Sequence, residues 1–122
     1  MSEDFSGIYA GEFEEVAENI RLEAMDEAQE LVNSLDLLLG EVRHDPDQMP
    51  EFATKARHTS LILKKQAGTV GLRLIGTIAH RMENYLSSIK ELPPRAVDDM
   101  QIFIDYLTDT LEGRISLDSD AS

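Results

Sequence analysis

The sequence contains no cysteine and no long run of apolar residues. Without cysteine the chain forms no disulfide and offers no thiolate to a zinc ion, which is compatible with a reducing compartment. A membrane helix needs ~18 consecutive apolar residues, and a secretory leader needs a basic region before an apolar one. The sequence shows neither pattern, so we expect a cytoplasmic protein without a membrane partner.

Basic residues are scarce as well. Lys and Arg number 11 against 24 Asp and Glu, which gives a formal net charge of -13. Such a charge repels the backbone of nucleic acids and anionic surfaces, so we expect no nucleic-acid partner. With 42% hydrophobic and 29% charged residues the composition is that of a small globular domain, and 122 residues leave room for one hydrophobic core.

Helical periodicity dominates the sequence, and no alternating strand pattern is present. Apolar residues recur at intervals of three and four, which places them on one face of a helix. Four stretches show this spacing: Met25, Ala28, Val32, Leu35, Leu39 and Val42; Phe52, Ala56, Thr59, Leu63 and Ala67; Leu72, Ile75, Ala79, Met82, Leu86 and Ile89; and Val97, Met100, Ile104, Leu107 and Leu111. We therefore predict four helices, of which the first covers residues 22–43 and the second residues 52–67.

Short breaks separate these helices. Pro46 and Pro50 interrupt the chain after the first, Gly68 to Gly71 indicates a tight turn after the second, and Pro93-Pro94 precedes the last. Connections this short favour antiparallel neighbours, so we expect an all-α, up-and-down four-helix bundle over residues 22–113.

The two ends of the chain differ from this central domain. In the N-terminal segment, residues 1–21, Phe13, Val16 and Ile20 are spaced for a helix. This segment forms either a short additional helix or the start of a longer helix continuous with the next. Residues 114–122 are polar, and we expect a flexible tail there.

Two segments carry a motif. After Leu61 come Lys64 and then Ala67-Gly68-Thr69, one residue and Gly71, and the next helix contains Ala79-His80-Arg81-Met82-Glu83-Asn84. Together they resemble the histidine phosphotransfer domain family, most closely the N-terminal domain of chemotaxis histidine kinases. The resemblance covers residues from about 22 to 113. The family pattern is an acceptor histidine, two residues, lysine, two small residues, Ala-Gly-Thr, one residue and glycine.

The resemblance implies a shell of three residues around the acceptor, at positions held here by Lys64, His80 and Glu83. In such a shell a carboxylate on one imidazole nitrogen fixes the tautomer and raises the nucleophilicity of the other nitrogen. An ammonium group offsets charge on the incoming phosphoryl group. The resemblance thus implies an intact shell.

The acceptor position itself falls on Leu61, whose hydrocarbon side chain has no lone pair for attack on a phosphoryl group. In addition, Lys65 and Gln66 stand where the family has small residues, which alters the surface that a receiver domain approaches. The resemblance therefore implies binding without transfer. It assigns partner contacts to Leu61, Lys64, Lys65, Gln66 and Gly68.

Two questions about this helix stay open from the sequence. His58 lies one turn before Leu61, ~4.5 Å along the axis and ~60° around it, and is an alternative acceptor, although Lys64 and Glu83 would then lie a turn too far away. Leu61 and Leu63 point about 160° apart, so both cannot face one core directly. Leu61 is either an exposed binding residue or part of the core.

Other chemistry has little support. His80 and Glu83 are spaced for a metal pair, but carboxylate-bridged metal bundles repeat such a pair on two helices, and here it occurs once. A hydrogen bond from one of them to a residue such as Lys64 on a neighbouring helix is the simpler interpretation. His44, beside Asp45 and Pro46, fits a turn. No Ser-His-Asp set or phosphate-binding glycine loop is found, so we expect no metal and no cofactor.

Three functions are consistent with these patterns. The first is a pseudo-phosphotransfer protein that binds a response-regulator receiver domain or a histidine kinase in a two-component or chemotaxis phosphorelay. The second is an active phosphotransferase that uses His58. The third is a helical interaction protein unrelated to receivers, which binds another helix or itself. The oligomeric state does not follow from the sequence.

Overall fold

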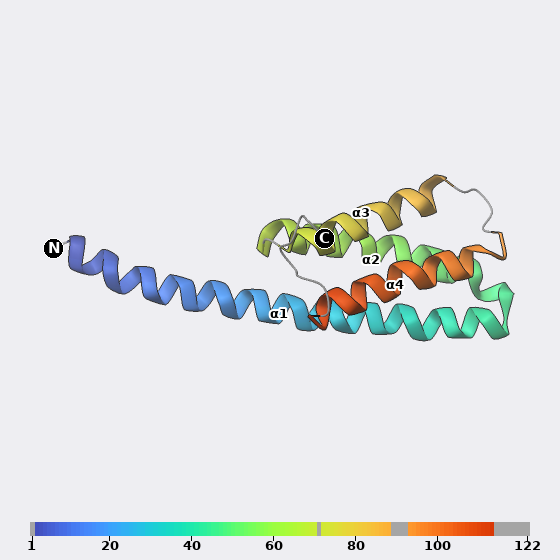
Figure 1. Ribbon diagram of the computed structural model, residues 1–122, viewed down its shortest axis with the longest axis horizontal. Coiled ribbons are helices and arrows are strands. Elements are labelled where there is room, and N and C mark those ends of the chain that lie inside the picture. The colour runs from blue at the N-terminus through green and yellow to red at the C-terminus, as the bar shows by residue number, and fades with distance from the viewer. Residues whose placement is uncertain (1, 71, 89–92, 114–122) are drawn as a thin grey trace.

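Figure 1 shows a computed structural model of the chain, which describes residues 2–70, 72–88 and 93–113. Side chains are described at positions 11–68, 72–88 and 93–113. The elements follow in the order α1 (Ser2–His44), a short 3-10 helix η1 (Pro46–Gln48), α2 (Met49–Val70), α3 (Arg73–Ser88) and α4 (Ala96–Leu111). The all-α expectation is confirmed.

The four α-helices form a closed ring of neighbours. α2 packs between α1 and α3, and α4 packs between α3 and α1. Successive helices run in opposite directions, as the ribbon shows (Figure 1). This is the up-and-down bundle that the short connections predicted.

The core contains the predicted apolar stripes. Each helix buries one face, because residues three and four apart lie one above the other. Phe52, Leu35, Leu39, Leu63 and Leu86 are fully enclosed, together with Leu72, Ile75, Met82, Met100, Ile104 and Leu107. Met25 and Val97 are partly buried at the edge of this core. Ile89 lies outside the described residues.

The first helix is longer than the bundle requires. It continues without a break through Arg21, so the N-terminal segment is the start of α1 and not a separate short helix. Residues 11–20 are all exposed, and this part of α1 extends beyond the other three helices (Figure 1). We call residues 2–20 the N-terminal arm. By the rise of an α-helix it is roughly 28 Å long.

The breaks between helices have local causes. The Asp45 side chain accepts a hydrogen bond from the backbone N–H of Asp47 at 3.2 Å, and Pro46 occupies the first position of η1, where its missing N–H costs nothing. The second break differs from expectation: α2 continues through Gly68 to Val70, so the turn starts later. Gly71 and the tail at 114–122 lie outside the described residues.

Tyr85 joins α3 to α4. Its hydroxyl donates a 2.6 Å hydrogen bond to Asp99 Oδ2, and its ring lies 5.8 Å from that of Phe103, centroid to centroid. Burial, and then the hydrogen bond to the Asp99 carboxylate, raise the pKa of Tyr85 to about 12 from 10.0. The neutral phenol is therefore the form that the folded protein favours.

This shift predicts a loss of stability in alkali. The folded state holds the Tyr85 proton more tightly than the unfolded state does, so the contribution is complete below pH 10 and is lost as pH rises toward about 12. A titration followed by tyrosinate absorbance should show one late transition, which Tyr85→Phe removes. Tyr106→Phe, a change on the exposed side of α4, should leave that transition in place. A late transition that survives Tyr85→Phe would contradict the assignment.

Candidate functional site

α2 and α3 come close together around Gly76. A Cβ atom added to Gly76 would lie 3.1 Å from the Cβ of Ala67, which is tighter than ordinary contact. Two small residues therefore let the helix backbones come together here. As a result, polar side chains on the outer sides of α2 and α3 come within reach of one another.

Lys64 and Glu83 form an ion pair across this seam. Lys64 Nζ donates to Glu83 Oε1 at 2.6 Å, and the two side chains are 34% and 23% exposed. Such a charge-assisted contact, partly shielded from water, is stronger than a fully exposed ion pair. The predicted hydrogen bond between helices is found, and it brings together two of the three residues of the expected shell.

The position of Leu61 settles the question that periodicity left open. Its side chain is 50% exposed, whereas Leu63 is fully buried. Leu61 stands one turn before Lys64 on the outer side of α2, since residues three apart share a helix face. The structure therefore has a hydrocarbon side chain at the solvent boundary, beside an ion pair.

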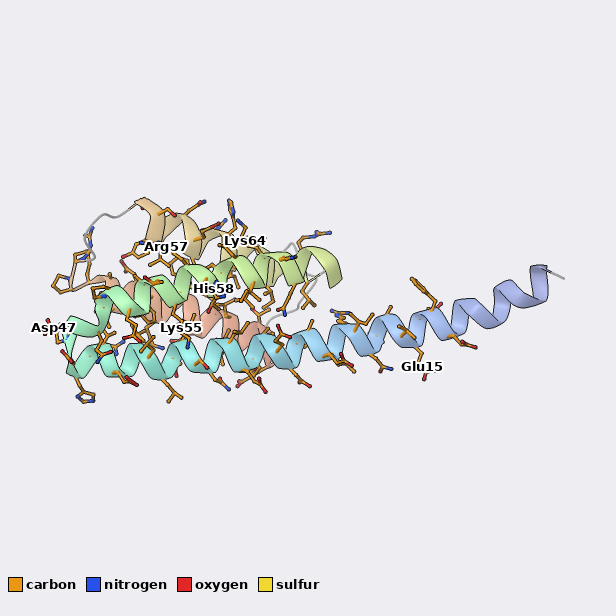
Figure 2. All side chains as sticks on the ribbon, turned by 180° about the vertical axis from the view of Figure 1, so that it is seen from behind. Glu15, Asp47, Lys55, Arg57, His58 and Lys64 are labelled. Atoms are coloured by element: carbon orange, nitrogen blue, oxygen red, sulfur yellow. The ribbon has the colours of Figure 1, made fainter. Side chains whose placement is uncertain are left out.

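Other exposed residues of α2 surround Leu61. Arg57, His58, Lys65 and Gly68 are all exposed, and each lies within about 60° of Leu61 around the helix. Figure 2 labels Arg57, His58 and Lys64 along this helix, together with Lys55. We call the exposed side of α2, with the adjoining outer side of α3, the α2–α3 face.

Gln66 is not part of this face. It lies about 140° around the helix from Leu61. Its side-chain nitrogen donates a 2.6 Å hydrogen bond to Glu27 Oε1 on α1. Of the five residues expected to contact a partner, the structure thus brings together Leu61, Lys64, Lys65 and Gly68, and it turns Gln66 toward α1.

His80, the third residue of the expected shell, lies on α3. It is exposed, and its Nε2 atom lies 3.2 Å from the Asn84 side-chain nitrogen one turn further along the same helix. His80 and Lys64 line one open hollow of about 730 Å³ between α2 and α3. Its lining combines small residues with basic ones. The lining residues are Lys64, Ala67, Gly68, Arg73, Gly76, Thr77, His80 and Arg81.

Sequence reasoning missed the charge of this face. From Phe52 to Met82 the chain has no Asp or Glu, although the whole chain is strongly acidic. The same stretch holds more than half of the basic residues: Lys55, Arg57, Lys64, Lys65, Arg73 and Arg81. A separate charge count for each predicted helix would have revealed it.

Two further searches concern metal ions and membranes. Among the residues that the structure describes, no three His, Asp or Glu side chains gather closely enough to hold a metal ion. Within the same residues, no helix has both the length and the apolar composition needed to cross a membrane.

Comparison with known proteins gave no relative. No protein-family model, no curated protein and no solved structure matches the chain.

Proposed function

We propose that this chain is a pseudo-phosphotransfer protein, which binds a receiver domain or a histidine kinase of a phosphorelay and transfers no phosphoryl group. The observation that carries the proposal is the exposed Leu61 beside the Lys64–Glu83 pair. This geometry agrees with the shell that the resemblance to histidine phosphotransfer domains implies. In that resemblance the acceptor position is Leu61, which cannot accept a phosphoryl group.

The other histidines are poorly supported as acceptors. His58 is exposed one turn before Leu61, and therefore two turns before Lys64 on α2. The Lys64–Glu83 pair cannot orient an imidazole that far away, and misplacement of ~1 Å already costs a catalytic group much of its effect. His80 contacts Asn84 on its own helix. Neither position combines a nucleophile with an orienting carboxylate and an ammonium group.

The charge of the α2–α3 face favours a receiver domain as the partner. A phosphorylated receiver carries its phosphoryl group on an aspartate, so the site that it presents for transfer is anionic. Arg57 and Lys65 bring positive charge to the surroundings of Leu61, whereas the charge of Lys64 is balanced by Glu83. An apolar centre within a complementary charged rim is the usual arrangement of a binding surface.

Absence of phosphotransfer is the first expected result. When the chain is incubated with a phosphorylated receiver or an autophosphorylated chemotaxis-type kinase, we expect no acid-labile label on it. The same mixture should give a complex detectable by calorimetry. A true phosphotransfer domain, run in parallel, provides the positive control.

The two outcomes separate the proposal from its main alternative. Label that appears and is then lost in His58→Gln would identify His58 as an acceptor and contradict the proposal. Label that is lost in His80→Gln would contradict it in the same way.

A further inference from the structure

The N-terminal arm exposes an apolar stripe. Phe13, Val16 and Ile20 are 73%, 53% and 49% exposed, and they share one face of the helix because they are three and four residues apart. Figure 1 shows this part of α1 beyond the rest of the bundle, and Figure 2 labels Glu15 there. Large exposed apolar side chains in a row are typical of an interaction surface.

The arm is also strongly acidic. Between residues 11 and 20 it has four glutamates, Glu12, Glu14, Glu15 and Glu18, and no basic residue. Glu12 and Glu14 lie on either side of Phe13, about 100° away around the helix. Two such arms side by side would place like charges together, which disfavours a coiled coil of arm with arm.

The chain itself contains a surface of opposite charge. The α2–α3 face exposes the basic residues Arg57, Lys65 and Arg81, and the acidic Glu83 is paired with Lys64. Its hollow offers small residues, Ala67, Gly68 and Gly76, with Lys64 and Arg81 also in its lining. An aromatic side chain between two carboxylates, such as Phe13 between Glu12 and Glu14, matches a hollow of this chemistry.

We infer that the N-terminal arm of one copy docks on the α2–α3 face of a second copy. The contact forms between copies, because α1 is one helix from Ser2 to His44 and the arm cannot turn back onto its own bundle. A twofold arrangement lets each arm reach the other's face, so the contact occurs twice. A stable dimer buries ~1,600 Å² in total, so each of the two contacts needs to bury only about half of that, arm and face together.

This inference does not rest on the proposed function, because it concerns two copies of the chain without a receiver. The test is the mass of the full chain in solution, measured by light scattering over a range of concentrations. We expect a concentration-dependent rise from 13.7 kDa toward twice that mass, and a weaker association in high salt. A chain that stays monomeric at every concentration would overturn the inference.

Phe13→Ala is the variant that tests the arm. We expect association about tenfold weaker for each contact, and thus about a hundredfold weaker for a dimer with two contacts. Leu37→Ala is the matched control, because Leu37 is also 73% exposed on α1 but lies within the bundle region. It should associate as the unchanged chain does. Equal effects of the two substitutions would overturn the inference.

Arg81→Glu separates the docking of arm on face from the docking of arm on arm. It introduces negative charge at the hollow of α3 and leaves the arm unchanged. We expect it to reduce association by at least about tenfold. A dimer that is lost in Phe13→Ala but retained in Arg81→Glu would show that the arms pair with each other, and would overturn the assigned face.

Discussion

Replacement of Leu63 by alanine should lower the free energy of unfolding by about 2–5 kcal/mol, because the side chain is fully buried where α2 faces the core. Replacement of Leu61 by alanine should change it by no more than about 0.5 kcal/mol. The two substitutions are both Leu→Ala on α2, at positions two residues apart, so they differ only in the burial of the side chain. Denaturant unfolding followed by helical circular dichroism measures both.

This pair of substitutions tests which side of α2 faces the core. Similar losses in the two variants would mean that Leu61 belongs to the core, and the apolar centre of the α2–α3 face would then be absent. A change in the dependence of unfolding on denaturant would instead indicate a more compact denatured state or a loss of two-state behaviour. The unfolding free energies are therefore compared only between variants whose free energy depends equally steeply on denaturant concentration.

Leu61→Asp should abolish most binding to a receiver domain. A few side chains at the centre of an interface each contribute about 2 kcal/mol or more, and if Leu61 is one of them its loss corresponds to roughly 30-fold in affinity. The added carboxylate also opposes an anionic partner. Titration calorimetry with a cognate receiver would measure the loss.

The matched control for this substitution is Ile102→Asp. Ile102 is 54% exposed on α4, close to the 50% of Leu61, but it lies on another helix. We expect it to leave receiver binding unchanged. Equal losses would show that binding responds to surface charge in general and does not use the face around Leu61.

The fold could be predicted from the sequence because its helices carry their information locally. The stripe from Ala28 to Val42 repeats with a period of 3.6 residues, and each of its members is buried. Gly68 was wrongly assigned to the turn after α2, because two glycines close together, Gly68 and Gly71, usually indicate a turn. A helix nevertheless tolerates one glycine at a cost of ~1 kcal/mol. The sequence did not decide whether the N-terminal segment is a separate helix or part of α1. The apolar spacing of Phe13, Val16 and Ile20 is the same in both cases.

The candidate site was predictable only in part. A hydrogen bond from His80 or Glu83 to a residue such as Lys64 was expected, and the structure has the one between Lys64 and Glu83. The exposure of Leu61 could not be predicted, because it depends on how much of α2 is covered by α1 and α3. The sequence pattern of α2 alone gives no information about that packing. The turn of Gln66 toward Glu27 had the same origin, because it depends on a contact 39 residues apart in the chain.

The separation of charge has a consequence for how the net charge of -13 is understood. Beyond a Debye length, which is ~8 Å at physiological ionic strength, a partner senses little of either sign. Within that distance it senses the helix in front of it: acidic at the arm and basic between Phe52 and Met82. Close to the surface, an anionic partner is therefore repelled at the arm and attracted beside the exposed basic residues of α2 and α3. For such a chain the net charge influences solubility, whereas the position of each charge on the surface influences which partner binds there.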